Sequence, residues 1–195
     1  MRRFLLVGLA AAFMMLRLVV IPTNAQTQAT SGARALVTVP PYISVTPIQP
    51  VWDMSTVLTG SFSATVTWRI EANVQTIQMM LEASDLYRDD DPSKTEIPPI
   101  PLDTTKPAYF TGEFGRLTSG GGNQASWTGP GTPNSGFPTK QTETVFYQSS
   151  QASITNQLVS TQIYFDQQEK IKPTGAYSGR IKITALIPPV TSRGH

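Results

Sequence analysis

Four aspartates gather in one short acidic segment, and carboxylates at this density could bind a calcium ion. Calcium prefers oxygen ligands, and ionised carboxylates supply many of them in proteins. The segment has neither the alternating ligands nor the central glycine and late glutamate of an EF-hand loop. Two interpretations stay open, a calcium site and a solvated acidic turn that follows a strand. The candidate metal ligands are Asp85, Asp89, Asp90 and Asp91.

A pair of carboxylates could also hydrolyse a glycosidic bond if the fold brought two of them together. The acidic residues considered for this role are Asp85, Glu96, Glu113 and Glu143. The chain contains no cysteine, its one histidine is the terminal His195, and it has no motif for an activated nucleophile or a catalytic zinc. We therefore expect no catalytic residue, no cofactor and no enzymatic activity.

Two aromatic residues lie in a segment, residues 118–140, that is rich in glycine and proline. This composition predicts a long surface loop, and binding residues often lie on loops. Trp127 and Phe137 are therefore candidate ligand-binding residues, for a carbohydrate or another surface. The alternative for Trp127 is a structural clasp onto the domain. Trp68, in contrast, lies on the apolar face of a predicted strand and is expected in the core.

The first 25 residues have the form of a secretory signal peptide. Arg2 and Arg3 precede an apolar stretch over residues 4–16, and small residues stand before a cleavable bond after Ala25. An uncleaved membrane anchor is the alternative, because the apolar character continues beyond this stretch. Arg17 opposes the anchor, since a charge near the middle of a single span is costly. We predict export, with the protein secreted, periplasmic or on the cell surface.

The charge balance changes once the export signal is set aside. Without residues 1–25, acidic side chains outnumber basic ones by one, and no cluster of lysine or arginine remains. Nucleic-acid binding needs such a cluster, so we expect no nucleic-acid partner. No second apolar segment of membrane-spanning length follows, so we expect membrane contact only through the export signal. Without disulfides, the fold must depend on its core or on neighbouring subunits.

Alternation of apolar and polar residues predicts strands along most of the remaining chain. It is clearest at residues 61–71, where one face carries Phe62, Val66, Trp68 and Ile70. Further strands are predicted at residues 74–83, 144–148, 158–166 and 176–187, and the only helix candidate spans residues 149–158. This pattern predicts an all-β fold, an immunoglobulin-like antiparallel β-sandwich with long Gly/Pro-rich loops, with a closed barrel as the alternative.

One domain is expected over residues 36–190, after a flexible leader at residues 26–35 and before a tail at residues 191–195. The beginning of this domain is β-prone but broken by prolines. It could form an ordinary edge strand, where proline is tolerated. It could instead leave its own domain and complete a neighbouring subunit's sheet. The strand-exchange candidates are Leu36, Val37, Val39, Ile43 and Val45.

These features together resemble subunits of chaperone–usher fimbriae. The resemblance is carried by the signal peptide, the polar N-terminal extension with its β-prone segment, the all-β domain and the closing residues 175–184 (Gly-Ala-Tyr-Ser-Gly-Arg-Ile-Lys-Ile-Thr). It implies export to the periplasm of a Gram-negative bacterium. It further implies a periplasmic chaperone that lends a strand, and polymerisation with copies of itself or related subunits at an outer-membrane usher.

Two functions are therefore expected from different classes. The first is an exported structural subunit of a pilus-like fibre that assembles by β-strand addition. The second is a monomeric secreted adhesin or carbohydrate-binding module that uses the segment at residues 118–140.

Overall fold

The computed structural model describes residues 37–49, 59–119, 122–169 and 172–189. The chain divides into two compact units, Met1–Thr38 and Val39–His195, and the fold is that of the second unit. The predicted signal peptide, leader and C-terminal tail lie outside the described residues, as do Leu36 and His195.

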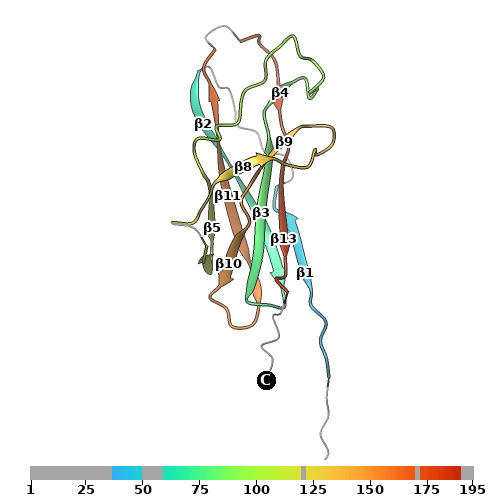
Figure 1. Cartoon of the computed structure of the whole chain (residues 1–195), viewed down its shortest axis with the longest axis vertical. Coiled ribbons are helices and arrows are strands. Elements are labelled where there is room, and N and C mark those ends of the chain that lie inside the picture. Colours follow the sequence, from blue (N-terminus) through green and yellow to red (C-terminus); the bar gives the residue numbers. More distant parts are fainter. Residues whose placement is uncertain (1–36, 50–58, 120–121, 170–171, 190–195) are drawn as a thin grey trace, which may run out of the picture. The chain divides into compact units, whose positions relative to one another are not determined.

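Every regular element that the described residues form is a β-strand (Figure 1). The strands are β1 (Ile43–Pro47), β2 (Gly60–Ala72), β3 (Thr76–Ser84), β4 (Tyr87–Arg88), β5 (Ala108–Gly112), β6 (Gly115–Leu117), β7 (Gln124–Ala125), β8 (Trp127–Pro130), β9 (Thr139–Thr142), β10 (Val145–Ser149), β11 (Thr155–Gln167), β12 (Tyr177–Ser178) and β13 (Ile181–Leu186). All their pairings are antiparallel.

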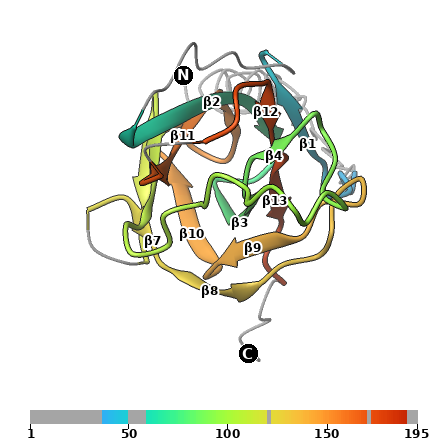
Figure 2. The same cartoon turned by 90° about the horizontal axis from the view of Figure 1, so that it is seen from above.

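One sheet folds over on itself to make two layers. Its strand order is β1-β2-β11-β5-β6-β10-β3-β9-β8, with β13 on the free side of β3 and β7 on β5. The layers meet where β5 joins β6 through a single residue pair, Gly112 with Gly115. Strands surround the interior when the molecule is seen from above (Figure 2). The prediction of an all-β antiparallel sandwich is confirmed, and its immunoglobulin-like variant stays a prediction.

The core forms because the alternation in the long strands places their apolar side chains on one face. Burial alternates along β2 and β11, which pair over their whole length. Phe62 stacks on Phe165 with ring centroids 5.5 Å apart. The indole Nε1 of Trp68 donates a hydrogen bond to Thr161 Oγ1 at 3.0 Å, so the most polar atom of this core side chain has a partner. Trp68 is in the core, as its place on the strand predicts.

Two expectations from the sequence differ from the structure. The helix candidate at residues 149–158 is a turn followed by the start of β11, because the alternating burial of that strand already begins at Thr155. The predicted loop at residues 118–140 contains β7, β8 and the start of β9. Its glycines and prolines therefore lie in short strands and tight turns. Gly122, Gly129 and Gly136 have positive φ, a backbone conformation that glycine adopts readily.

Candidate functional site

The strand-exchange candidates separate into two groups. Ile43 and Val45 belong to β1, which pairs with β2, and their side chains pack against the core of their own domain. In this structure both residues thus belong to an edge strand of their own domain, which favours the edge-strand interpretation over exchange of these residues with another subunit. Val37 and Val39 precede β1, and their side chains are 83% and 72% exposed. Leu36 lies outside the described residues.

Asn73 fixes the start of β1 on the domain. Its side-chain oxygen accepts a hydrogen bond from Tyr42 N at 2.7 Å, and its side-chain nitrogen donates to Pro40 O at 2.7 Å. The backbone nitrogen of Asn73 donates to Tyr42 O at 3.2 Å. Pro40 and Tyr42 are thus attached to the domain through Asn73.

The edges of β1 and β13 face each other without pairing in the described part of the chain. The two strands lie on the same side of the molecule (Figures 1 and 2). Ser84 N donates to Arg180 O, so by antiparallel alternation Lys182 and Thr184 bond to β3. The main-chain groups of Ile181, Ile183 and Ala185 then point away from β3, toward β1.

The same alternation applies to β1. Asn73 N bonds to Tyr42 O and Ile48 N bonds to Thr67 O, so the even-numbered residues of β1 bond to β2. The main-chain groups of Ile43, Val45 and Pro47 then point to the opposite edge, toward β13. Pro47 has no N–H group, which removes one donor from this edge.

A groove of about 510 Å³ lies where the end of β1 faces the beginning of β13 and the residues just before it. One wall comes from Pro47 and the other from Gly179, Arg180 and Ile181. Its floor is made of core side chains from β2, β11 and the residue before β4: Ala64, Val66, Trp68, Leu86 and Phe165. The groove is therefore a place where the interior of the sandwich meets an unpaired sheet edge.

Gly179 shapes the wall beside β13. A Cβ atom on this residue would lie 2.8 Å from Asp85 O, 2.8 Å from Ser84 Oγ and 2.9 Å from Leu86 Cδ2. The chain before β13 can therefore approach the end of β3 only with glycine here. Ser84 Oγ in turn accepts a hydrogen bond from Arg180 N at 2.8 Å, which fixes the beginning of β13.

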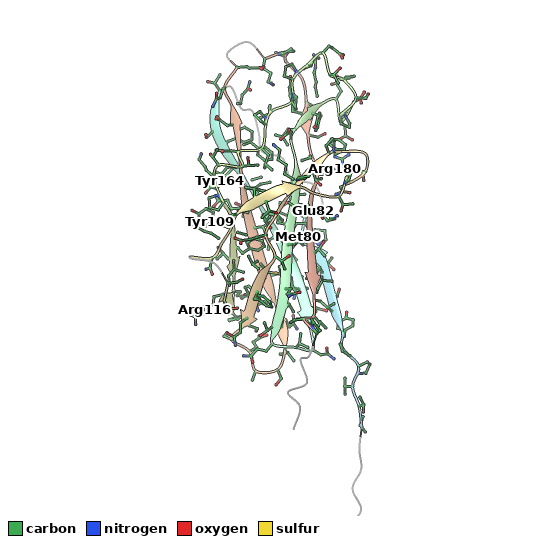
Figure 3. The ribbon with its side chains drawn as sticks, viewed as in Figure 1. Met80, Glu82, Tyr109, Arg116, Tyr164 and Arg180 are labelled. Carbon is green, nitrogen blue, oxygen red and sulfur yellow. The ribbon has the colours of Figure 1, made fainter. Side chains whose placement is uncertain are left out.

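Arg180 joins the groove wall to the acidic segment. Its guanidinium lies 4.2 Å from the ring centroid of Phe137, and its Nη2 is 2.7 Å from Asp90 Oδ2. The hydrogen bonds from Arg180 and from the Ser178 hydroxyl lower the pKa of Asp90 below its ordinary value. Figure 3 shows Arg180 and Glu82 near the level at which β8 and β9 cross the sheet.

The four aspartates do not form one metal site. Asp85 Oδ1 accepts from Leu102 N at 2.8 Å and from Lys140 Nζ at 3.3 Å. Asp89 pairs with Lys94, and Asp91 accepts hydrogen bonds from the Ser93 side chain and backbone, which lower the pKa of Asp91. No group of three or more metal-ligating side chains occurs among the residues that the structure describes. The acidic turn thus uses its carboxylates on nearby cations and turn donors.

The four acidic residues considered for glycoside hydrolysis lie on separate parts of the fold. Asp85 follows β3, Glu96 lies in the segment between β4 and β5, Glu113 in the turn before β6, and Glu143 between β9 and β10. Glu143 Oε1 accepts a hydrogen bond from Ser126 N at 3.0 Å. This carboxylate therefore fixes the connection between β7 and β8.

The two aromatic candidates have different environments. Phe137 is 2% exposed and packs edge-to-face on Tyr87, with ring centroids 5.6 Å apart, so its position does not fit the predicted ligand-binding role. Trp127 is half-buried, packs against the core and donates from Nε1 to Lys106 O at 3.0 Å. It is thus a clasp onto the domain. It also borders a second surface groove.

The groove between β1 and β13 was not predicted from the sequence. Its walls meet because β13 pairs with β3 and β1 with β2, and such long-range pairing leaves no local pattern. The alternation of residues 176–187 predicts a strand that ends before two prolines, and the beginning of this strand forms one wall of the groove. No sequence pattern predicts that Gly179 and Ser84 shape this wall.

Within the described residues, no helix is long and apolar enough to cross a bilayer. Comparisons of the chain with protein-family models, with curated proteins and with solved structures gave no significant match.

Proposed function

We propose that this protein is an exported structural subunit of an extracellular or cell-surface fibre, and that its subunits join by β-strand addition. The observation that carries the proposal is the groove between β1 and β13. The strand edges that border it pair with no other strand of the described residues, and its floor consists of core side chains. An exposed edge of this kind can pair with a strand from another chain.

The donor strand in this proposal is the segment just before β1 of a neighbouring subunit. Val37 and Val39 are largely exposed and are separated by one residue, so in an extended strand they point to the same face. That face would lie on the apolar floor of the neighbour's groove. The chain's own β1 stays in place, because Asn73 fixes its start.

Main-chain hydrogen bonds would supply much of the affinity, since the main-chain groups of Ile181, Ile183 and Ala185 point away from β3, and Ile181 lines the groove. The β1 side offers fewer donors because Pro47 lacks an N–H group. The added strand is therefore expected to pair chiefly with β13. The resemblance to chaperone–usher subunits adds a periplasmic chaperone and an outer-membrane usher as proposed partners, and the periplasm and fimbrium as proposed locations.

A charge placed on the donor segment tests this proposal. In Val39→Asp the exposed side chain leaves the stability of its own domain nearly unchanged, within about 0.5 kcal/mol. Burial of the carboxylate in a neighbour's apolar groove costs several kcal/mol, so assembly should weaken by about a hundredfold or more. The measurement is the mass distribution of the exported full chain by size-exclusion chromatography with light scattering.

The matched control is Ile154→Asp, because Ile154 is also exposed, at 45%, and lies in the turn before β11. This variant should assemble like the wild type. Unchanged assembly of Val39→Asp, or a wild-type chain that stays monomeric at every concentration, would contradict the proposal.

A further inference from the structure

A second groove, of about 590 Å³, lies on the surface beside Trp127. It runs between the segment that follows β3 and the β8–β9 hairpin. Asp85 and Tyr87 line this groove, whereas the alternate residues Ser84 and Leu86 line the groove between β1 and β13. The two grooves therefore lie on opposite sides of one segment, and the second one is independent of the proposed subunit assembly.

Trp127 gives this groove a fixed aromatic wall. Its indole Nε1 is held by Lys106 O at 3.0 Å, and its side chain packs partly against the core. A β-bulge between Trp127 and Gly129 interrupts the pairing of β8 with β9, and Gly129 has φ 150°. Bulges redirect side chains and occur often beside functional sites. The indole is thus positioned before any ligand binds.

Tyr87 gives the groove a fixed hydroxyl. Its ring packs edge-to-face on the buried Phe137 with centroids 5.6 Å apart, so the ring position is determined by the core. Burial and the nearby Asp85 carboxylate raise the pKa of Tyr87 above its ordinary value. The hydroxyl therefore stays protonated at neutral pH and can both donate and accept a hydrogen bond.

The charged groups of the groove compensate each other. Lys140 Nζ lies 3.3 Å from Asp85 Oδ1, and both side chains line the groove together with the hydroxyl-bearing Thr104 and Thr139. No cation in this lining remains without a carboxylate, which disfavours phosphate or carboxylate ligands. The lining instead offers paired donors and acceptors beside a flat apolar ring.

We propose that this second groove binds a neutral pyranose saccharide. The C–H face of the sugar would lie on the Trp127 indole, and its hydroxyls would bond to Tyr87, Asp85 and Lys140. The volume of about 590 Å³ is within the usual range for small-ligand sites and leaves room for a short saccharide. A subunit with such a site would carry adhesive function on its side surface.

The test is saturation-transfer NMR on the exported full chain, in whatever assembly state it is purified, with the methyl glycosides of glucose, galactose, mannose and N-acetylglucosamine as probes. We expect transfer to the ring protons of at least one probe. Tyr87→Phe and Lys140→Gln each remove polar contacts but keep most of the side chain, and at least one should weaken binding by about three- to tenfold.

Tyr164→Phe is the matched control, because Tyr164 also packs edge-to-face on an aromatic ring, Tyr109, and does not line this groove. It should bind the probe like the wild type. Absence of transfer to all four probes would overturn the proposal. Transfer that neither Tyr87→Phe nor Lys140→Gln weakens, or that Tyr164→Phe weakens equally, would overturn it as well.

Discussion

At the end of β5, Gly112 packs so closely against Tyr147 that no side chain fits at this position. A Cβ atom on Gly112 would lie 1.6 Å from Tyr147 Oη, 2.5 Å from Cζ and 2.8 Å from Cε2. The Tyr147 side chain is fully buried, and its hydroxyl donates to Gln157 Oε1 at 2.8 Å. The ring cannot yield toward solvent without breaking this hydrogen bond. Gly112→Ala should therefore move Tyr147 out of its place in the core.

The cost combines two terms. Overpacking of a full core costs about 1–3 kcal/mol, and loss of the Tyr147–Gln157 hydrogen bond adds about 1 kcal/mol. We expect Gly112→Ala to lower the free energy of unfolding by about 2–4 kcal/mol, which lowers Tm by about 4–16 °C in a chain of this size. The backbone of Gly112 is not in the left-handed region, so without the contact the alanine would be neutral or slightly stabilising.

Urea unfolding followed by near-ultraviolet circular dichroism measures this cost. Gly136→Ala is the control, because no atom lies within 4 Å of its added Cβ and only the strain of φ +83° remains, about 1–2 kcal/mol. In a Tyr147→Phe background, the closest contact is gone, and Gly112→Ala should cost at least about 1 kcal/mol less. A Gly112→Ala variant as stable as the wild type would refute this description of the core.

Two further predictions concern pH and a buried carboxylate. Burial raises the pKa of Tyr147 to about 12 from 10.0, so unfolding is favoured as pH rises above 10 because only the unfolded chain then loses this proton. The free energy of unfolding is unaffected by this group below about pH 10 and decreases by roughly 3 kcal/mol by about pH 12. A stability difference between the wild type and Tyr147→Phe that does not change over this range would contradict the prediction. Glu82 is 1% exposed; its Oε2 lies 2.5 Å from Lys182 Nζ, and its Oε1 accepts a hydrogen bond from Thr132 N at 2.7 Å. Glu82→Ala should cost about 2–4 kcal/mol and speed amide exchange at Thr132 before global unfolding, and Thr132 exchange equal to that of the wild type would contradict this role.

The sequence predicted those strands whose burial alternates along one element. Residues 61–71 and 158–166 each show the alternation that β2 and β11 later use to build the core. This agreement has a local cause, because an inward-facing position in a strand is always two residues from the next. Thr155, in contrast, is a buried polar residue in a segment with no apolar alternation, so the beginning of β11 was interpreted as a helix.

The candidate sites depend on contacts between distant segments and could not be predicted in the same way. Phe137 is buried because Arg180 and Tyr87 cover it, and neither is near it in the sequence. Asp90 of the acidic turn likewise pairs with Arg180, which is distant from it in the sequence. Trp127 was chosen as a ligand-binding candidate from its Gly/Pro-rich surroundings in the sequence, and the structure places it both against the core and beside a groove.

Hydrogen exchange along β13 tests the proposed strand addition most directly. In the monomer, the amides of Lys182 and Thr184 bond to β3, whereas those of Ile181, Ile183 and Ala185 point toward β1, and Ile181 lines the groove. Strand addition predicts that the latter three amides exchange fast in the monomer and become protected in the assembled form. Assembly that leaves their exchange fast would contradict the claim that a neighbour's strand enters this groove.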